Sequence, residues 1–297
     1  MPIMCPTAII NRLFPVFVSL AALAAAGCGA ATSTGAGSSP TTPGLTYPTG
    51  SRDVVLRVST GGGYVPSEVA MTTVPEFTLY GDGTVIVPGA VMAIYPGPAM
   101  SPLMTFKLSE EEVQALLASA DRSGLLDGRP VDYGDMGSVG VSDMPTTTVT
   151  LNADGKQVKR DAYALSADAT GDRLTPAQRE ARIALSRFVQ SLPQGSSPQP
   201  YTPSAIAVNI GPFNGERMPD ATPMVWPLEG DLASDGKRVS SGLPYRCLAV
   251  TGEDTRTLLE TLSGANDQTE WLAQPAGDDT FRLVVRPVLP DENGCAV

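Results

Sequence analysis

Between residues 53 and 192, several short segments alternate apolar and polar residues, as strands with one buried face do. The clearest alternation runs from Val54 to Ser59. Two pairs of segments flank Gly81-Asp82-Gly83 and Asn152-Ala153-Asp154-Gly155, and these residue types are typical of hairpin turns. The pattern therefore predicts strands at 54–59, 76–80, 84–87, 146–151 and 156–162.

Two other segments carry apolar residues at helical spacing. The first begins at Ser109, where Glu112 completes an S-x-x-E capping box, and its stripe consists of Val113, Leu116, Leu117 and Ala120. The second begins at Thr175, with Pro176 at the first helical position, and its stripe consists of Ala181, Leu185, Phe188, Val189 and Leu192. Both stripes are expected to pack on the strands, which makes 53–192 an α+β domain.

A second, smaller α+β domain is predicted at 205–297. Residues 193–204 are rich in proline, glutamine, serine and glycine, so we place a linker there. Thr251 and Asp254 are expected to cap a short helix with Leu258, Leu259 and Leu262 on its apolar face. The strands of this domain are predicted at 205–210, 246–250 and 281–288. Because strands and helices do not alternate regularly, the predicted fold class is α+β, with antiparallel strands and one or two helices in each of two small units.

The N-terminal segment has the features of an export signal. Arg12 precedes an apolar stretch from Leu13 to Ala26, which is shorter than the roughly 20 residues that span a bilayer. The run Leu23-Ala24-Ala25-Ala26-Gly27-Cys28 resembles a bacterial lipoprotein lipobox, although that family more often has leucine where this chain has Ala25. The resemblance implies that 1–27 is a signal peptide and that Cys28 carries the lipid. The residue usage, with little lysine, is similar to that of exported actinobacterial proteins.

Residues 28–52 are expected to form a flexible tether after the lipidated cysteine. They are mostly glycine, alanine, serine, threonine and proline, with Leu45 and Tyr47 as the large apolar residues, so they cannot bury a core. The predicted location is the outer face of the cytoplasmic membrane, with the membrane contacted through the N-terminal lipid. Cleavage after an Ala-x-Ala run is the alternative, and it would release a secreted protein instead.

Two of the cysteines are predicted to form a disulfide. Cys5 leaves with the signal peptide and Cys28 takes the lipid, so Cys247 and Cys295 remain as a pair in an oxidising compartment. Neither lies in a C-x-x-C motif and the chain has no histidine, so a metal-binding or redox role is disfavoured.

Composition restricts the chemistry further. With 0 histidines, Ser-His-Asp and Cys-His catalysis and His-ligated zinc are excluded. The 31 acidic and 20 basic residues give a net charge of −11 without a basic cluster, so nucleic acid is not an expected partner. The absence of histidine does not exclude carboxylate-pair chemistry, Ser-Lys chemistry or oxygen-ligated cations, but no motif for a cofactor or metal site is present.

The order of elements in the first unit resembles emfourin-type metalloprotease inhibitors. A strand ending in Val58-Ser59 and a Gly-rich turn are followed by Leu108-Ser109-Glu110-Glu111-Glu112, which opens a helix, and then by a hairpin and a helix. The chain departs from that family by a long insertion over 84–105, which contains Pro88, Pro96, Pro98 and Pro102. The resemblance implies inhibition of an exported protease through an exposed rigid loop, and no contact residue is carried over.

Three hypotheses about function follow. The leading one is a membrane-anchored, non-catalytic lipoprotein that binds a protein or another envelope component. The alternatives are a protease inhibitor of emfourin type and an envelope enzyme that uses carboxylates. A contact surface is expected at the turn Gly61, Gly62, Gly63 and Tyr64. Tyr95, Trp226 and Trp271 are further candidates, although tyrosine and tryptophan also commonly lie in cores.

Overall fold

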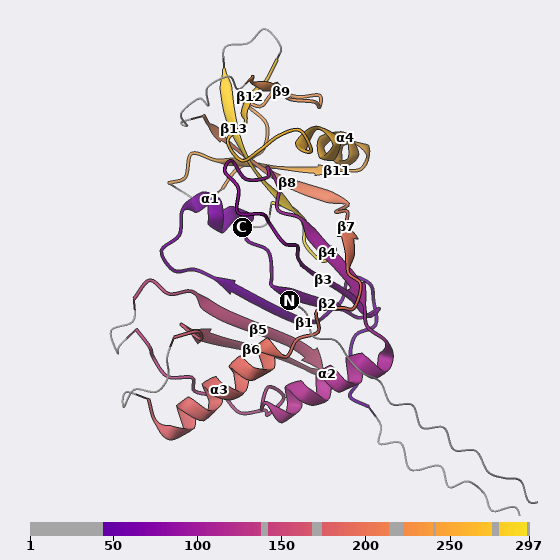
Figure 1. Ribbon diagram of the computed structural model, residues 1–297, viewed down its shortest axis with the longest axis vertical. Helices are drawn as coiled ribbons and strands as arrows, with labels where there is room; N and C mark the ends of the chain where they lie inside the picture. Colours follow the sequence, from indigo (N-terminus) through magenta and orange to yellow (C-terminus); the bar gives the residue numbers. More distant parts are fainter. Residues whose placement is uncertain are drawn as a thin grey trace, which may run out of the picture. The chain divides into compact units, whose positions relative to one another are not determined.

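The computed structural model describes residues 44–137, 142–167, 174–213, 222–239, 242–274 and 279–295. The chain divides into two units, Met1–Pro43 and Gly44–Val297, and every described residue belongs to the second. That unit contains two mainly antiparallel sheets and a few helices (Figure 1). The predicted α+β class is therefore confirmed. The predicted signal peptide, Cys28 and the first part of the predicted tether lie outside the described residues.

The first sheet has seven strands in the order β6-β5-β1-β2-β3-β4-β7, and every neighbouring pair is antiparallel. The two predicted hairpins are present, as β2 with β3 and β5 with β6. Asp154 and Gly155 both have positive φ, 53° and 68°, and an Asp-Gly pair accepts that geometry readily. The strands are β1 (Val54–Gly61), β2 (Phe77–Tyr80), β3 (Thr84–Pro88), β4 (Leu103–Lys107), β5 (Thr146–Ala153), β6 (Lys156–Tyr163) and β7 (Gln199–Tyr201).

Two helices complete the core of this sheet, α2 (Glu110–Arg122) and α3 (Pro176–Gln190). Their apolar faces share one cluster with the strands, in which Leu117, Val149 and Leu185 are at most 1% exposed. The predicted stripe of α2 is buried in full. In α3, Arg182 is also buried, and its guanidinium donates to the main-chain oxygens of Tyr133, Tyr163 and Ala164.

Both helices begin where the sequence predicts, because their first turns are capped. The Glu112 main-chain N–H donates to the Ser109 hydroxyl at 3.3 Å, and the Ser109 N–H donates to the Glu112 carboxylate at 2.7 Å. Thr175 and Gln178 form the same reciprocal pair at the start of α3, at 3.2 and 2.8 Å. Each capping box satisfies two donors that the helix itself leaves free.

The second sheet has six strands in the order β10-β11-β8-β13-β12-β9. Its core includes Trp226 and Trp271, whose rings meet edge to face with centroids 6.5 Å apart. The helix α4 (Glu253–Leu262) packs its Leu258 and Leu262 into the same cluster. The strands are β8 (Ala205–Pro212), β9 (Met224–Val225), β10 (Lys237–Arg238), β11 (Arg246–Thr251), β12 (Glu270–Leu272) and β13 (Thr280–Pro287).

The predicted cap of α4 is wrong. Thr251 is the last residue of β11 and pairs with Ala205, so its backbone stays in the sheet and its side chain does not cap the helix. The chain turns instead at Gly252, which has a φ of 68° and a ψ of −140°. That conformation is almost confined to glycine, so the strand-to-helix turn rather than a side-chain hydrogen bond sets the start of α4.

Two segments, one just before β8 and one just after β13 in the chain, connect the second sheet to the first. Residues 199–201 of the predicted linker form β7, which pairs with β4 and so extends the first sheet. After β13, Leu289 packs beside Tyr80 and Ile86 of the first sheet. The predicted disulfide Cys247–Cys295 is present. It links the C-terminal tail after β13, which contains Cys295, to β11, which contains Cys247.

Candidate functional site

The loop between β3 and β4 presents large apolar side chains to solvent. Val91 is 51% exposed, Met92 73%, Ile94 56% and Tyr95 74%. We call these four residues the apolar crest. Single exposed apolar residues are common on soluble proteins, but a group of them within five consecutive positions marks a surface that a partner can cover.

The sequence around the crest carries no charge. No aspartate, glutamate, lysine or arginine lies between Asp82 and Lys107, in a chain whose net charge is −11. Exposed loops are usually polar, because their backbone and side chains face water. A long charge-free exposed loop is therefore unusual, and contacts made by the crest are expected to be apolar rather than ionic.

Hydrogen bonds hold the loop at its base and along its second half. The Gly89 N–H donates to the Pro102 oxygen at 2.8 Å, which closes the base. The Gly97 N–H donates to the Asp267 carboxylate at 3.0 Å, and the Asp267 N–H donates to the Gly97 oxygen at 2.9 Å. Ala99 and Met100 pack against the core of the second sheet. The crest thus projects from a loop that is fixed on both of its sides.

The short helix α1 (Ser67–Thr72) lies beside this loop. None of its residues is buried, and Val69 is 49% exposed. Val69 and Val91 line the same cavity, of about 290 Å³, together with Gly97 and Asp267. The segment before α1 is also exposed, with Tyr64 at 90% and Val65 at 47%.

The predicted Gly61–Tyr64 turn is exposed throughout. Gly62 and Gly63 have φ values of 77° and 78°, and a Cβ on Gly63 would lie 2.9 Å from the Asp143 oxygen. Glycine is needed at Gly63 for both reasons. The turn directs Tyr64 into solvent. One exposed aromatic residue, Tyr64, therefore precedes α1, and another, Tyr95, lies in the crest.

The two tryptophans among the predicted surface candidates lie in the core instead. Trp226 is 4% and Trp271 1% exposed. Trp271 lies on β12, and Trp226 directly follows β9, the strand that pairs with β12. Both rings belong to the core cluster that also contains Leu258 and Leu262 of α4. A partner cannot reach them in this fold.

Carboxylates near the cavity are already engaged. Glu68 of α1 accepts a hydrogen bond from the Tyr245 hydroxyl at 2.7 Å, and this bond lowers the pKa of Glu68 below its usual value. Burial, with the same bond, raises the pKa of Tyr245 to about 12. A general acid needs the opposite shift, a raised carboxyl pKa. Among the described residues, every carboxyl group with a resolved shift has its pKa lowered: Glu68, Asp82, Glu110, Glu112, Asp132 and Asp291.

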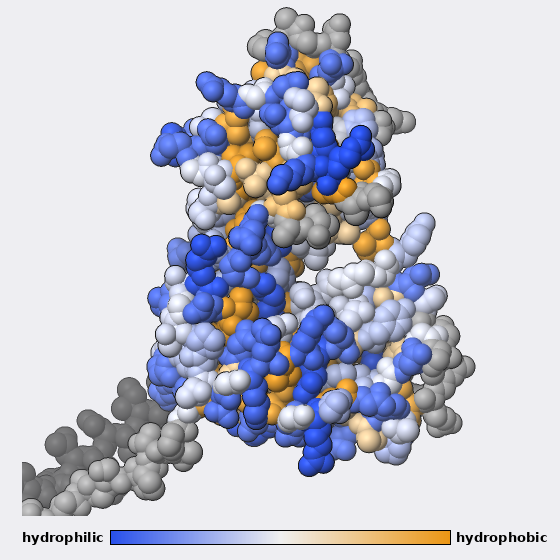
Figure 2. Space-filling view, turned by 180° about the vertical axis from the view of Figure 1, so that it is seen from behind, coloured by the Kyte–Doolittle hydropathy of each residue, from blue (hydrophilic) through white to orange (hydrophobic). Residues whose placement is uncertain are grey.

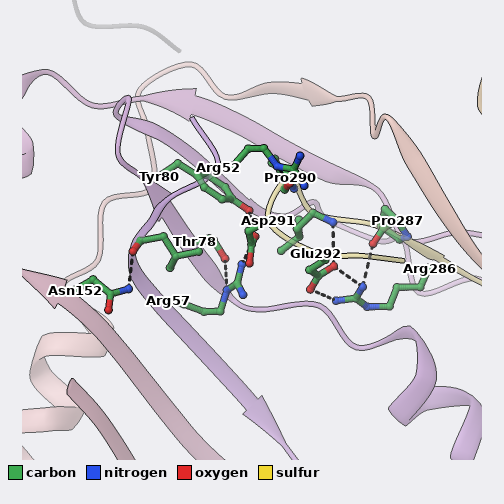
Figure 3. A network of polar contacts seen from close by, with 12 residues as sticks. Arg52, Arg57, Thr78, Tyr80, Asn152, Arg286, Pro287, Pro290, Asp291 and Glu292 are labelled. Carbon is green, nitrogen blue, oxygen red and sulfur yellow. Dashed lines mark hydrogen bonds and ion pairs between the residues drawn. The ribbon is translucent and has the colours of Figure 1, made fainter. Parts of the chain in front are cut away.

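The densest polar network lies elsewhere, where the C-terminal tail crosses the first sheet (Figure 3). Asp291 accepts hydrogen bonds from Arg57 at 2.7 Å and from the Tyr80 hydroxyl at 2.8 Å. Glu292 forms an ion pair with Arg286 at 2.7 Å. Burial alone would raise the pKa of Asp291, but the bonds from Arg57 and Tyr80 outweigh burial and lower it. This network fixes the tail, and Glu292 together with the tail residues Leu289 and Pro290 lines a cavity of about 470 Å³.

The predicted contact residues Tyr64 and Tyr95 are exposed, whereas the crest residues Val91, Met92 and Ile94 were not predicted. The signal was present: a stretch without charge that contains valine, methionine, isoleucine and tyrosine in a Gly- and Pro-rich insertion. The partnership of Asp291 with Arg57 gives no local signal, because the two residues are 234 positions apart.

The molecular surface shows apolar residues in small patches bordered by hydrophilic side chains (Figure 2).

Among the described residues, no helix has both the length and the apolar character needed to cross a membrane. No protein-family model, curated protein or solved structure matches the chain.

Proposed function

We propose that this chain is a lipid-anchored extracytoplasmic protein that binds a partner protein through the apolar crest and has no catalytic role of its own. One observation carries the proposal: Val91, Met92, Ile94 and Tyr95 are all more than half exposed in a charge-free loop that is fixed at its base. Contact with a partner would remove these exposed apolar side chains from water, which lowers the free energy of the complex.

The residue types and the anchoring of the loop support a protein partner. Methionine and aromatic residues are enriched in the centres of protein interfaces, whereas charged residues are depleted there. A loop that is already held in place loses little conformational entropy when it binds. Val69, which lines the same cavity as Val91, would extend the contact onto α1, and the exposed Tyr64 and Val65 precede that helix in the chain.

The anchor is supported by the sequence alone. The lipobox-like run before Cys28 would attach the chain to the outer face of the cytoplasmic membrane. Leu45 and Tyr47 of the predicted tether 28–52 pack against the core of the first sheet, so the part of the tether before Gly44 would hold the compact unit away from the membrane. Expression of the whole chain in a bacterium that acylates lipoproteins tests this point. The native chain should partition into the detergent phase with the membranes, whereas Cys28→Ser should appear in the aqueous phase. Equal partitioning of both chains would contradict lipidation.

Binding is tested with the compact unit Gly44–Val297 immobilised on a resin and exposed to envelope extract. The native unit should retain a specific protein, and Met92→Ser/Tyr95→Ser should lose most of it. Ile183→Ser is the matched control, because Ile183 is 45% exposed on α3. The proposal fails if the crest variant retains the same protein as well as the native unit does.

The inhibitor alternative is favoured by one observation, the fixed and exposed loop, since inhibitors act through rigid loops. It is tested on the same unit by adding an excess to a secreted metalloprotease. Loss of protease activity with the native unit, but not with Met92→Ser/Tyr95→Ser, would support inhibition. Full protease activity at excess native unit would count against it.

A further inference from the structure

A cavity of about 490 Å³ lies at one end of the second sheet. Strands β8, β10, β11 and β13 all contribute to its wall. Its volume falls within the range of small-molecule sites, roughly 300–1,000 Å³. None of its lining residues belongs to the crest or to α1, although Tyr245 in its wall donates a hydrogen bond to Glu68 of α1 at 2.7 Å.

The strand register gives this cavity an apolar floor. Ile210 and Pro212 are two residues apart on β8 and therefore face the same side of the sheet. Phe281 of β13 lies directly opposite Pro212, and opposed residues of antiparallel strands share a face. Ile210 and Phe281 belong to or pack against the core cluster of this sheet, so the floor is the open end of that core.

The same face carries two arginines on one flank of the cavity. Arg246 of β11 lies opposite Ile210, and Arg238 of β10 lies opposite Arg246. Like charges directly opposite each other on neighbouring strands destabilise a sheet. Among the described residues, neither arginine forms an ion pair with a carboxylate, although Asp279 also lines the cavity.

The two guanidinium groups differ in how they are held. Arg246 donates to the main-chain oxygens of Leu232 and Ala233, which fixes its orientation without neutralising its charge. An arginine has five N–H donors, so Arg246 keeps donors for another acceptor. The Arg238 side chain is exposed, and its guanidinium has no hydrogen bond to another described residue. The cavity therefore combines a fixed cation, a free cation and an apolar floor.

We propose that this cavity binds a small organic anion that has an apolar body and one carboxylate or phosphate group. The apolar body would cover Ile210, Pro212 and Phe281, and the anionic group would lie between Arg238 and Arg246. Binding would supply a negative charge to two arginines that form no ion pair among the described residues. Guanidinium groups suit both carboxylate and phosphate, because their N–H donors match the spacing of the oxygens.

The test uses 1-naphthyl phosphate as the probe and isothermal titration calorimetry of Gly44–Val297. The naphthyl compound should bind more tightly than inorganic phosphate, which lacks the apolar body, and more tightly than 1-naphthylmethanol, which lacks the charge. 1-Naphthoate, in the same titration, distinguishes a carboxylate from a phosphate preference. Affinity should fall as salt is raised, because screening weakens the ionic part of the interaction.

Two substitutions locate the binding. Arg238→Gln removes an exposed charge and should weaken binding of 1-naphthyl phosphate about tenfold, as expected for loss of a charge-assisted hydrogen bond. Arg122→Gln removes an exposed arginine at the end of α2 and should leave the affinity unchanged. Circular dichroism of both variants verifies the fold. Absence of binding at millimolar probe, or equal affinity for native and Arg238→Gln, would overturn the proposal.

Discussion

The two sheets of this protein are stabilised in different ways. Among the described residues, the main core of the first sheet contains 22 buried apolar residues and that of the second contains 11. The first sheet has two helices that begin with capping boxes, whereas α4 of the second has no side-chain cap. The second sheet has the disulfide and a tail that is bound to the first sheet. Small cores gain proportionately more from such cross-links.

The two regions are therefore vulnerable to different changes. A sheet with a large core should lose most when that core is opened. A sheet with a small core should lose most when its covalent or ionic links are removed. The following four variants separate these cases, because each acts on one kind of stabilisation.

Opening the larger core should have the largest effect. Leu117 of α2 is 0% exposed and lies in the cluster with both helices. Leu117→Ala should lower the free energy of unfolding by about 2–5 kcal/mol, through lost burial and the cavity that remains. Urea denaturation measures this change, and Ile183→Ala at an exposed position of α3 is the control. A loss below about 1 kcal/mol would show that the core repacks.

Removal of the disulfide should be the next most severe change. The bond joins residues 48 positions apart, so its loss should cost about 2–4 kcal/mol. Reduction of the native protein and the variant Cys247→Ser/Cys295→Ser should give similar results. Hydrogen exchange should show that β11 and β8 lose protection while β1 and β5 keep theirs. Equal loss in both sheets would refute the view that the link serves mainly the second one.

The ion pair in the tail should contribute less and should depend on pH. The pKa of Asp291 is lowered in the folded protein, so its contribution is present above its ordinary pKa of about 3.9 and is lost as pH falls through the folded value. Asp291→Asn should cost about 1–2 kcal/mol at pH 7, because Arg57 and Tyr80 lose a charged acceptor. The difference from the native protein should shrink below about pH 4.

Asp121→Asn is the control for this pH dependence, because Asp121 is exposed near the end of α2. Its denaturation free energy should follow that of the native protein across the same pH range. A difference between native and Asp291→Asn that stays constant down to pH 2 would contradict the assigned role of the carboxylate.

Local patterns predicted the first sheet better than the second. The Ser109 and Thr175 caps and the hairpin turns are local features, and each was found where the sequence placed it. The start of α4 was not predicted correctly. Thr251 pairs with Ala205 on β8, a strand far from it in the sequence, and this pairing overrides the preference of threonine for capping a helix. The short strands β9 and β10 are two residues each, too short for any periodicity to be visible.

The same distinction applies to the candidate sites. Tyr64 and Tyr95 could be proposed because they are aromatic, but Trp226 and Trp271 are also aromatic and are buried, so aromatic character does not decide exposure. The arginine cavity depends on the register of four strands. No spacing in the sequence brings Arg238, Arg246 and Phe281 onto one face, and only the pairing of their strands does.

The smallest of the four effects tests the helix caps. Ser109→Ala removes the acceptor for the Glu112 N–H and should cost about 1 kcal/mol, in the range of measured cap losses. Ser119→Ala in the same helix is the matched control, and it should be neutral or slightly stabilising, because alanine favours a helix interior. If both variants were neutral, the tertiary contacts of Leu116 and Leu117 would suffice to fix the start of α2. The larger core would then stabilise the first sheet without help from its caps, which would widen the difference between the two sheets.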